Sequence, residues 1–189
     1  GSTVQDNASG YDGTVYGGRW SREDGLEAYY SFDDGQVRQE GYREFAGSDT
    51  SYLTGPHEAV NNLDDFTVSF ELDLSDTTDA YTPVISGATA SQANNLLLGY
   101  NKDTNVWELY VAGTSYQFSA NESIEDSRWH TVTVSRQGDQ VSLYIDGMLI
   151  STVTANANTI TVDSGGFIIG QDQDSLGGGF SSTQTLKGG

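Results

Sequence analysis

The chain has 189 residues, with 27 Asp and Glu against 8 Lys and Arg, a formal net charge of -19 and no cysteine. This acidity excludes a nucleic-acid-binding role, because binding to phosphate backbones needs clustered cations. Disulfide cross-links are excluded by composition, and no apolar run of about 18 residues predicts insertion into a membrane. The length fits one domain over residues 1–189, which we expect to be a soluble module of a longer protein.

Alternation of apolar and polar residues with a period of two predicts β-strands along most of the chain. The pattern is clearest at residues 66–74, where Phe66, Val68 and Phe70 alternate with Thr67 and Ser69. Further strands are predicted at residues 95–100, 107–112, 115–119, 129–136, 140–145, 148–154 and 166–170. Turns rich in Gly, Asn and Asp separate them, and only residues 121–126 favour a helical turn. Many short strands predict an all-β fold, a two-sheet antiparallel β-sandwich of the jelly-roll type.

A pair of carboxylates follows the last of these strands, in the segment 170–180 with the sequence GQDQDSLGGGF. Positions i and i+2 of an extended chain point to the same side. Asp172 and Asp174 can therefore converge on one cation, with the carbonyl oxygen of Gln173 between them. Hard oxygen ligands of this kind suit Ca²⁺ rather than zinc or copper. The sequence therefore predicts a calcium site at this segment.

Three further motifs carry a family resemblance: SRWHTVTV at 127–134, VSLYIDG at 141–147 and FIIGQD at 167–172. Their order and spacing resemble the laminin-G-like and pentraxin branch of the concanavalin A-like jelly rolls. The motif SDTSYL at 48–53 and the segment 170–180 resemble pentraxins in particular. The resemblance covers residues 44–187 and implies the same sandwich fold.

Residues 1–43 depart from that family pattern and are expected to form unusual N-terminal strands. Residues 26–35 resemble the opening strand of bacterial laminin-G-like domains. Residues 7–16 resemble a segment that those domains usually place after that strand. This order implies rearranged strand connectivity at the termini.

The resemblance to pentraxins implies calcium ligands from two loops. One loop supplies Asp172, the main-chain oxygen of Gln173 and Asp174. The loop before the strand at 95–100 supplies Asn94. An aspartate of the family is replaced here by Ala93, so one expected ligand is missing at this position.

Asn95, or a residue from the unmatched N-terminal part, is a candidate to replace the missing ligand. For a second calcium ion the family uses a glutamine and a glutamate; the glutamine matches Gln184, but Ser181 stands at the glutamate position. The resemblance therefore implies one well-formed calcium site, with Gln184 as a candidate ligand of a second one.

The acidic, cysteine-free composition and the calcium site together resemble the peptide-binding modules of bacterial repeats-in-toxin (RTX) adhesins. This implies an extracellular module on a bacterial cell surface, joined to neighbouring domains of a larger adhesin and used in cell adhesion or biofilm formation. Asn94, Asp172 and Asp174 would hold a Ca²⁺ with an open coordination position for the carboxylate of a peptide or protein end. Two alternatives stay open: a lectin-like carbohydrate-binding module that uses calcium, and a structural spacer.

An enzymatic role was weighed against these binding roles, because some jelly rolls hydrolyse glycans with two carboxylates that lie about 5 to 9 Å apart. Glu71 and Asp73 share one face of a predicted strand, but they alternate with its apolar face and are expected to point to solvent. No nucleophile elbow, zinc-ligand spacing or phosphate loop occurs in the sequence. His130 is expected to be an ordinary strand residue. We therefore expect no enzymatic activity.

Overall fold

The computed structural model describes residues 2–4, 13–15, 43–74, 79–120, 123–126, 128–156 and 158–189. Residues 26–35 and most of 7–16, for which rearranged connectivity is predicted, lie outside these ranges. The chain divides into two compact units, Gly1–Ser31 and Phe32–Gly189. In the first, β1 (Ser2–Val4) pairs antiparallel with β2 (Gly13–Val15). A single domain over residues 1–189 stays a prediction.

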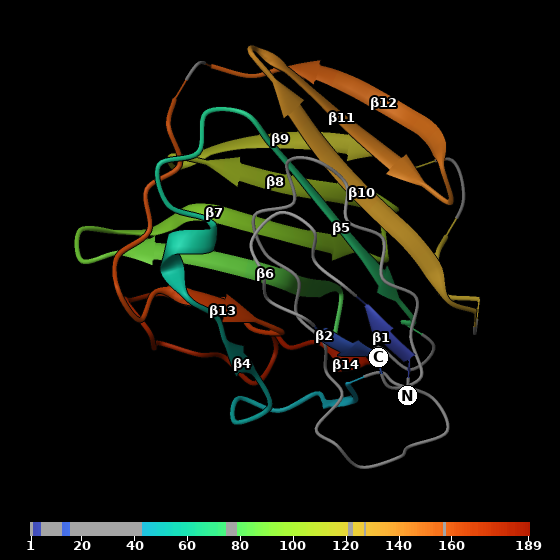
Figure 1. The fold of residues 1–189 in the computed structure, drawn as a ribbon, viewed down its shortest axis with the longest axis horizontal. Helices are drawn as coiled ribbons and strands as arrows, with labels where there is room; N and C mark the ends of the chain where they lie inside the picture. The colour runs from blue at the N-terminus through green and yellow to red at the C-terminus, as the bar shows by residue number, and fades with distance from the viewer. Residues whose placement is uncertain are drawn as a thin grey trace. The chain divides into compact units, whose positions relative to one another are not determined.

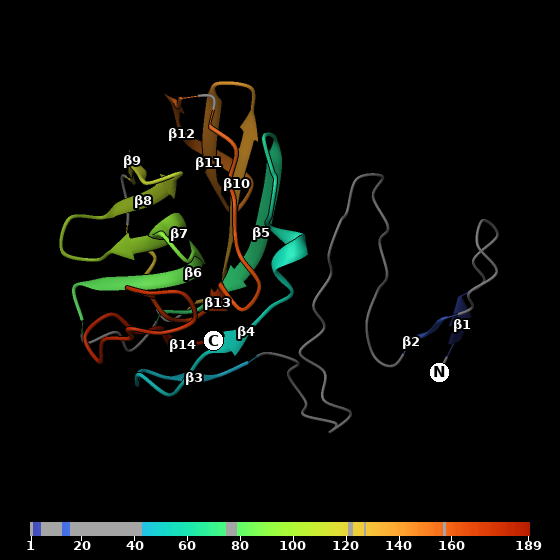
Figure 2. The same cartoon turned by 90° about the vertical axis from the view of Figure 1, so that its left-hand side faces the viewer.

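The second unit contains two facing antiparallel sheets. Its elements are β3 (Phe45–Ala46), β4 (Leu53–Thr54), the 3-10 helix η1 (His57–Ala59), β5 (Phe66–Leu72), β6 (Tyr81–Thr89), β7 (Gln92–Asn101), β8 (Val106–Val111), β9 (Thr114–Ser119), β10 (His130–Gln137), β11 (Gln140–Ile145), β12 (Met148–Thr154), β13 (Phe167–Ile169) and β14 (Lys187–Gly188). One sheet has the order β12-β11-β10-β5, and the other has the order β4-β13-β6-β7-β8-β9. Figure 1 shows the four-stranded sheet in front of the six-stranded one, and Figure 2 shows them as separate layers. The predicted two-sheet antiparallel sandwich is confirmed.

The hydrophobic core fills the space between these two sheets. In β8, Trp107 and Leu109 are fully buried, and the intervening residues are only partly buried. Val132 of β10 is also fully buried, from the opposite sheet. Each such side chain contributes about 1.5–3 kcal/mol through removal of apolar surface from water. The period-two pattern therefore identifies the side of each strand that faces the core.

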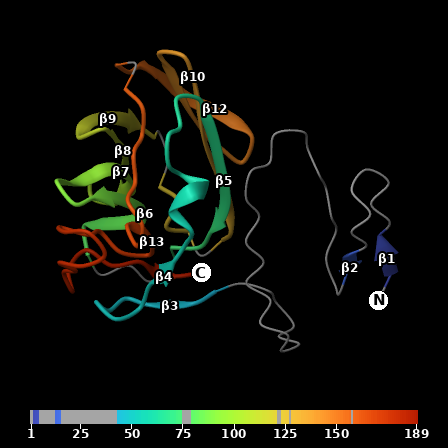
Figure 3. The ribbon, with the colours of Figure 1, turned by 60° about the vertical axis from the view of Figure 1, so that its left-hand side comes forward.

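The same alternation defines a second face of the six-stranded sheet. In β7, Leu96 and Leu98 belong to the core cluster. Leu97 and Gly99 therefore project to the opposite side. We call this side, which is turned away from the four-stranded sheet, the outer face. The segment that follows β13, drawn in red in Figure 3, lies beside β6 and β4.

The structure differs from the sequence predictions in several places, among them η1 and the short strands β3, β4 and β14, which were not predicted. β6 was not predicted, because Pro83 lacks a backbone donor and Gly87 weakens the strand pattern. Both residues are tolerated here, since the pairing with β7 shifts register after each of them. The helical turn predicted at 121–126 is absent from residues 123–126, which the structure describes. Ser123 Oγ and Asp126 Oδ1 accept hydrogen bonds from the backbone N–H groups of Glu125 and Arg128, and such local bonds compete with a helix.

No helix in the described part of the chain is long and apolar enough to cross a membrane.

Candidate metal and ligand site

The segment 170–180 leaves β13 through a sharp turn at Gly170. This residue has a φ of +89°, in the left-handed region that favours glycine. A Cβ at this position would also lie 2.5 Å from Cε1 of Phe45. Gly170 therefore fixes the direction in which the segment starts.

Gln173 attaches the segment to the six-stranded sheet. Its fully buried side chain donates from Nε2 to Ser86 Oγ at 2.7 Å and to the Gly166 carbonyl oxygen at 2.7 Å. Its Oε1 accepts a hydrogen bond from the Gly177 backbone N–H at 2.9 Å. Because these three hydrogen bonds satisfy the buried side chain of Gln173, Gln173 holds the segment in one conformation.

Two further contacts hold the ends of the segment. The fully buried Gln171 donates from Nε2 to the Ser48 carbonyl oxygen at 2.8 Å. At the other end, the ring of Phe180 packs against Tyr52, with 4.6 Å between the ring centroids. The segment is thus attached at its start, its middle and its end.

Asp172 is a buried carboxylate with one unpartnered oxygen. Gln171 and Gln173 alternate with Asp172 and Asp174, so burial of the glutamines turns the aspartates to the other side. Asp172 is only 6% exposed, and its Oδ1 has no hydrogen-bond partner, whereas Asp174 is exposed. Burial, together with the charges of Asp174 and Glu108, raises the pKa of Asp172 to about 6. A cation at Oδ1 would relieve this unfavourable state.

Asn94 and Asn95 add two more unpartnered oxygens at the start of β7. Oδ1 of each is buried and has no hydrogen-bond partner. Asn95 lies on the same side of β7 as Leu97. Leu97 is paired with Ser86, the residue to which Gln173 is bonded. Strict alternation places Asn95 on the outer face with the segment 170–180 and Asn94 on the opposite face, and the pairing of β7 with β6 shifts register at this part of β7.

These oxygens fit a calcium ion by their chemistry. Carboxylate, amide and carbonyl oxygens are the ligands that Ca²⁺ prefers. Among the residues that the structure describes, no three His, Cys, Asp or Glu side chains gather as a metal cluster. The predicted donor set differs from such a cluster because it has only two carboxylates. The ligand roles stay predictions for Asn94, Asn95, Asp172, Gln173 and Asp174.

Gln184, the candidate ligand of a second calcium ion, lies in a separate turn. Its backbone N–H donates to the carbonyl oxygen of Ser181 at 3.2 Å. Its ligand role also stays a prediction.

The sequence interpretation missed the anchoring side chains of Gln171 and Gln173. It assigned to Gln173 only a main-chain oxygen. The signal that points to them is their alternation with two aspartates directly after a buried strand, since one side of such a segment must face the protein.

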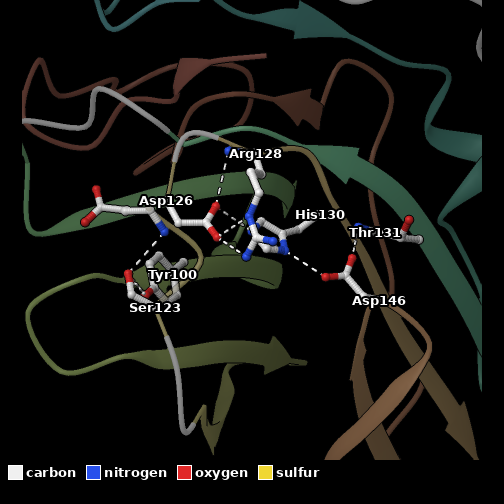
Figure 4. Close-up of polar contacts among 8 residues, drawn as sticks. Tyr100, Ser123, Asp126, Arg128, His130, Thr131 and Asp146 are labelled. Carbon is white, nitrogen blue, oxygen red and sulfur yellow. Dashed lines mark hydrogen bonds and ion pairs between the residues drawn. The ribbon is translucent and has the colours of Figure 1, made fainter.

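A second polar cluster surrounds His130 at the start of β10 (Figure 4). His130 is 6% exposed and lies between two carboxylates, with 2.8 Å from Nδ1 to Asp146 Oδ2 and 2.9 Å from Nε2 to Asp126 Oδ1. Burial lowers the pKa of His130, but the hydrogen bonds to Asp126 and Asp146 outweigh it, so the pKa is raised. Arg128 Nε also donates to Asp126 at 2.6 Å. His130 is a strand residue, as predicted, and it also joins Asp126, which precedes β10, to Asp146 in the β11–β12 turn.

Stability is therefore expected to fall as the pH rises through the raised pKa of His130. A histidine whose pKa is raised in the folded state stabilises that state fully at a pH below its ordinary pKa of about 6.5. This stabilisation is lost as the pH rises through the pKa of the folded state. We expect these contacts of His130 to contribute about 1 kcal/mol to the free energy of unfolding, because Asp126 and Asp146 are exposed and solvent screens their charges. Thermal unfolding between pH 6 and pH 9 should show a melting temperature that falls more steeply in the wild type than in His130→Gln. Equal slopes would contradict this role.

Known proteins share the fold of this chain and identify its family. Residues 46–186 match the family described as the concanavalin A-like lectin/glucanases superfamily, in its laminin-G form. The chain belongs to this family. It is 31% identical over 143 residues to C-reactive protein of Oryctolagus cuniculus, covering 75% of this chain and 62% of that protein. It is 29% identical over 141 residues to C-reactive protein of Mus musculus, with the same coverage of 75% and 62%. The chain thus spans less than two thirds of these curated relatives.

Solved structures share the fold at lower identity. A native heptameric SAP-like pentraxin from Limulus polyphemus has a TM-score of 0.56 and 22% identity, covering 74% of this chain and 63% of that chain. Domains LG4-5 of the mouse laminin alpha1 chain have a TM-score of 0.60 and 17% identity, covering 76% and 38%. The CBM40 of a Ruminococcus gnavus IT-sialidase has a TM-score of 0.57 and 14% identity, covering 77% and 84%. The predicted laminin-G-like and pentraxin-like resemblance is confirmed.

Proposed function

We propose that this chain is a calcium-dependent binding module of an extracellular bacterial adhesin of the RTX type, which takes the carboxylate end of a peptide or protein for adhesion or biofilm formation. The observation that carries the proposal is the buried, unpartnered Oδ1 of Asp172; Asn94 and Asn95 on β7 each carry a further buried, unpartnered oxygen. Such oxygens are costly in a folded protein unless a ligand satisfies them. The rigid attachment of segment 170–180 through Gln171 and Gln173 supports a preformed site.

The donor set leaves room for a ligand. Ca²⁺ binds about six to eight oxygens and, when bound, would attract an anionic oxygen of the ligand. The side chains of Asn94, Asn95, Asp172 and Asp174 and the carbonyl of Gln173 would supply the protein's share. A carboxylate suits the remaining positions because it brings two oxygens and a negative charge. Sugar hydroxyls bring no charge and usually need stacked aromatic rings.

A calcium-dependent carbohydrate-binding module is the second candidate. The description of the family names lectins, and a carbohydrate-binding module is among the proteins that share the fold. A structural spacer is the third candidate, because calcium at Asp172 would also stabilise the sandwich without any ligand.

We also propose that the module binds without catalysis. Glu71, the best candidate acid on β5, is exposed. The backbone of Asp73 exchanges hydrogen bonds with Gly189 at 2.8 and 3.1 Å. Glu71 and Asp73 therefore belong neither to the segment 170–180 nor to β7, which carry the predicted calcium ligands.

A peptide-binding assay separates these functions. Acetylated peptides with a free C-terminus, the same peptides with an amidated C-terminus, and an array of glycans would be tested with calcium and with a chelator. We expect binding of the free-carboxylate peptides only in calcium, and amidation should weaken it at least about tenfold.

Three other outcomes would contradict the peptide proposal. Glycan binding without peptide binding would favour the lectin-like module. Equal binding of free and amidated peptides would show that the carboxylate is not recognised. A fold that calcium stabilises but that takes neither ligand would favour the spacer.

A further inference from the structure

The outer face carries a second group of residues, Tyr81, Gly99 and Glu108, which we call the tyrosine–glutamate subsite. Gly99 of β7 is paired with Glu108 of β8 and with Pro83 of β6. The ring of Tyr81 lies over Gly99, since a Cβ at Gly99 would be 2.5 Å from Tyr81 Cζ. Glycine at this position thus leaves space for a phenol ring beside the Glu108 carboxylate.

Both polar groups of the subsite retain unused hydrogen-bonding capacity. Tyr81 Oη is buried and has no hydrogen-bond partner. The half-buried Glu108 accepts a hydrogen bond from Ser115 Oγ at 2.5 Å on its Oε1. A carboxylate has about four lone-pair sites on its two oxygens, so Glu108 can accept further hydrogens. The subsite is therefore suited to a ligand group that donates several hydrogen bonds.

The charges around the subsite are acidic. Burial raises the pKa of Tyr81, and the charges of Glu108 and Asp172 raise it further. Gly99 follows Leu97 on the outer side of β7, and Ser86, the partner of Leu97, is bonded to Gln173, so the subsite and the segment 170–180 share one face of the sheet. A cation held by Asp172 and Asp174 would offset their charge and would leave that of Glu108. A half-buried carboxylate is stabilised by a positively charged partner.

We propose that the tyrosine–glutamate subsite binds a positively charged amine or guanidinium group of the same ligand whose carboxylate lies at the calcium site. This inference rests on the proposed function and narrows its ligand to peptide ends with a basic group near the carboxylate. The basic group donates hydrogen bonds to Glu108 and to Tyr81 Oη. Tyr110 lies on the same face as Glu108, two residues further along β8, and makes a side-chain hydrogen bond with it.

A charge-exchange experiment tests the subsite. The probes are acetylated tetrapeptides with a free C-terminus, in which Lys or Glu stands at the last, second-last or third-last position and the other residues are glycine. Their dissociation constants would be measured in calcium for the wild type, Glu108→Gln, Glu108→Lys and Tyr81→Phe. Glu71→Gln, the same change on the exposed side of β5, is the matched control.

At one position at least, the wild type should prefer Lys over Glu by about tenfold. The preference should fall in Glu108→Gln, reverse in Glu108→Lys, weaken in Tyr81→Phe and stay unchanged in Glu71→Gln. Calcium-dependent binding with the same Lys-to-Glu ratio in the wild type and both Glu108 variants would overturn the subsite and leave the proposed function standing. Binding of no peptide in calcium would overturn both.

Discussion

Asp172→Asn is expected to abolish calcium binding and, at the same time, to raise the melting temperature of the calcium-free protein. The buried carboxylate has an unpartnered Oδ1 and is repelled by Asp174 and Glu108. Removing the charge relieves this repulsion, part of which is screened by solvent. We therefore expect the free energy of unfolding to rise by about 1 kcal/mol and the melting temperature to rise by about 2–4 °C. Loss of a charged ligand should weaken calcium binding by at least about 100-fold. Calorimetric calcium titration and thermal unfolding in chelator measure the two effects.

The opposite signs of these two effects distinguish a ligand from a structural residue. A carboxylate that only stabilised the fold would lower the melting temperature in chelator when replaced. Asp139→Asn is the matched control, because this exposed aspartate lies in the β10–β11 turn of the other sheet. Asp139→Asn should change neither the calcium affinity nor the melting temperature in chelator. Wild-type calcium affinity in Asp172→Asn would exclude Asp172 from the metal site.

Gln173→Leu is expected to destabilise the protein and to weaken calcium binding, although the main-chain oxygen predicted as a ligand remains. The change removes three hydrogen bonds, to Ser86 Oγ, to the Gly166 carbonyl and from the Gly177 N–H. A hydrogen bond contributes about 1 kcal/mol net, so we expect the free energy of unfolding to fall by about 3 kcal/mol and the melting temperature to fall by about 6–12 °C. Calcium affinity should fall about 10- to 100-fold, as for residues that orient metal ligands.

The control for this variant is Gln137→Leu, at the exposed end of β10. It should change stability by less than about 0.5 kcal/mol and leave calcium affinity unaltered. If Gln173→Leu were destabilised but bound calcium as tightly as the wild type, Gln173 would stabilise the fold without positioning the calcium ligands.

The local sequence pattern predicted most of the long strands, because apolar and polar residues alternate along a strand that has one face in the core. The strands around Trp107, Val132 and Leu143 show this, since all three are fully buried and their neighbours are less so. β6 escaped because Pro83 and Gly87 interrupt the pattern. The pairing of β6 with β7 on one side and with β13 on the other compensates for them, and the pairing with β13 is long-range.

The candidate site was predicted only in part, for a related reason. The spacing of Asp172 and Asp174 is visible in the sequence, and Asn94 came from the family resemblance. The contacts that hold them are not local: Gln173 bonds to Ser86, which is 87 positions away. The subsite at Tyr81 and Glu108 likewise depends on the register of three strands. Such neighbours become visible only when the sheet is assembled.

Calcium binding to the outer face through the segment 170–180 can be measured by titrating calcium into chelator-treated wild-type protein, followed by calorimetry and by the melting temperature. We expect one Ca²⁺ to bind saturably at millimolar concentrations or below. The melting temperature should rise with calcium, since an ion that binds only the folded state stabilises it. No saturable binding and an unchanged melting temperature up to about 10 mM calcium would show that the segment 170–180 holds no calcium.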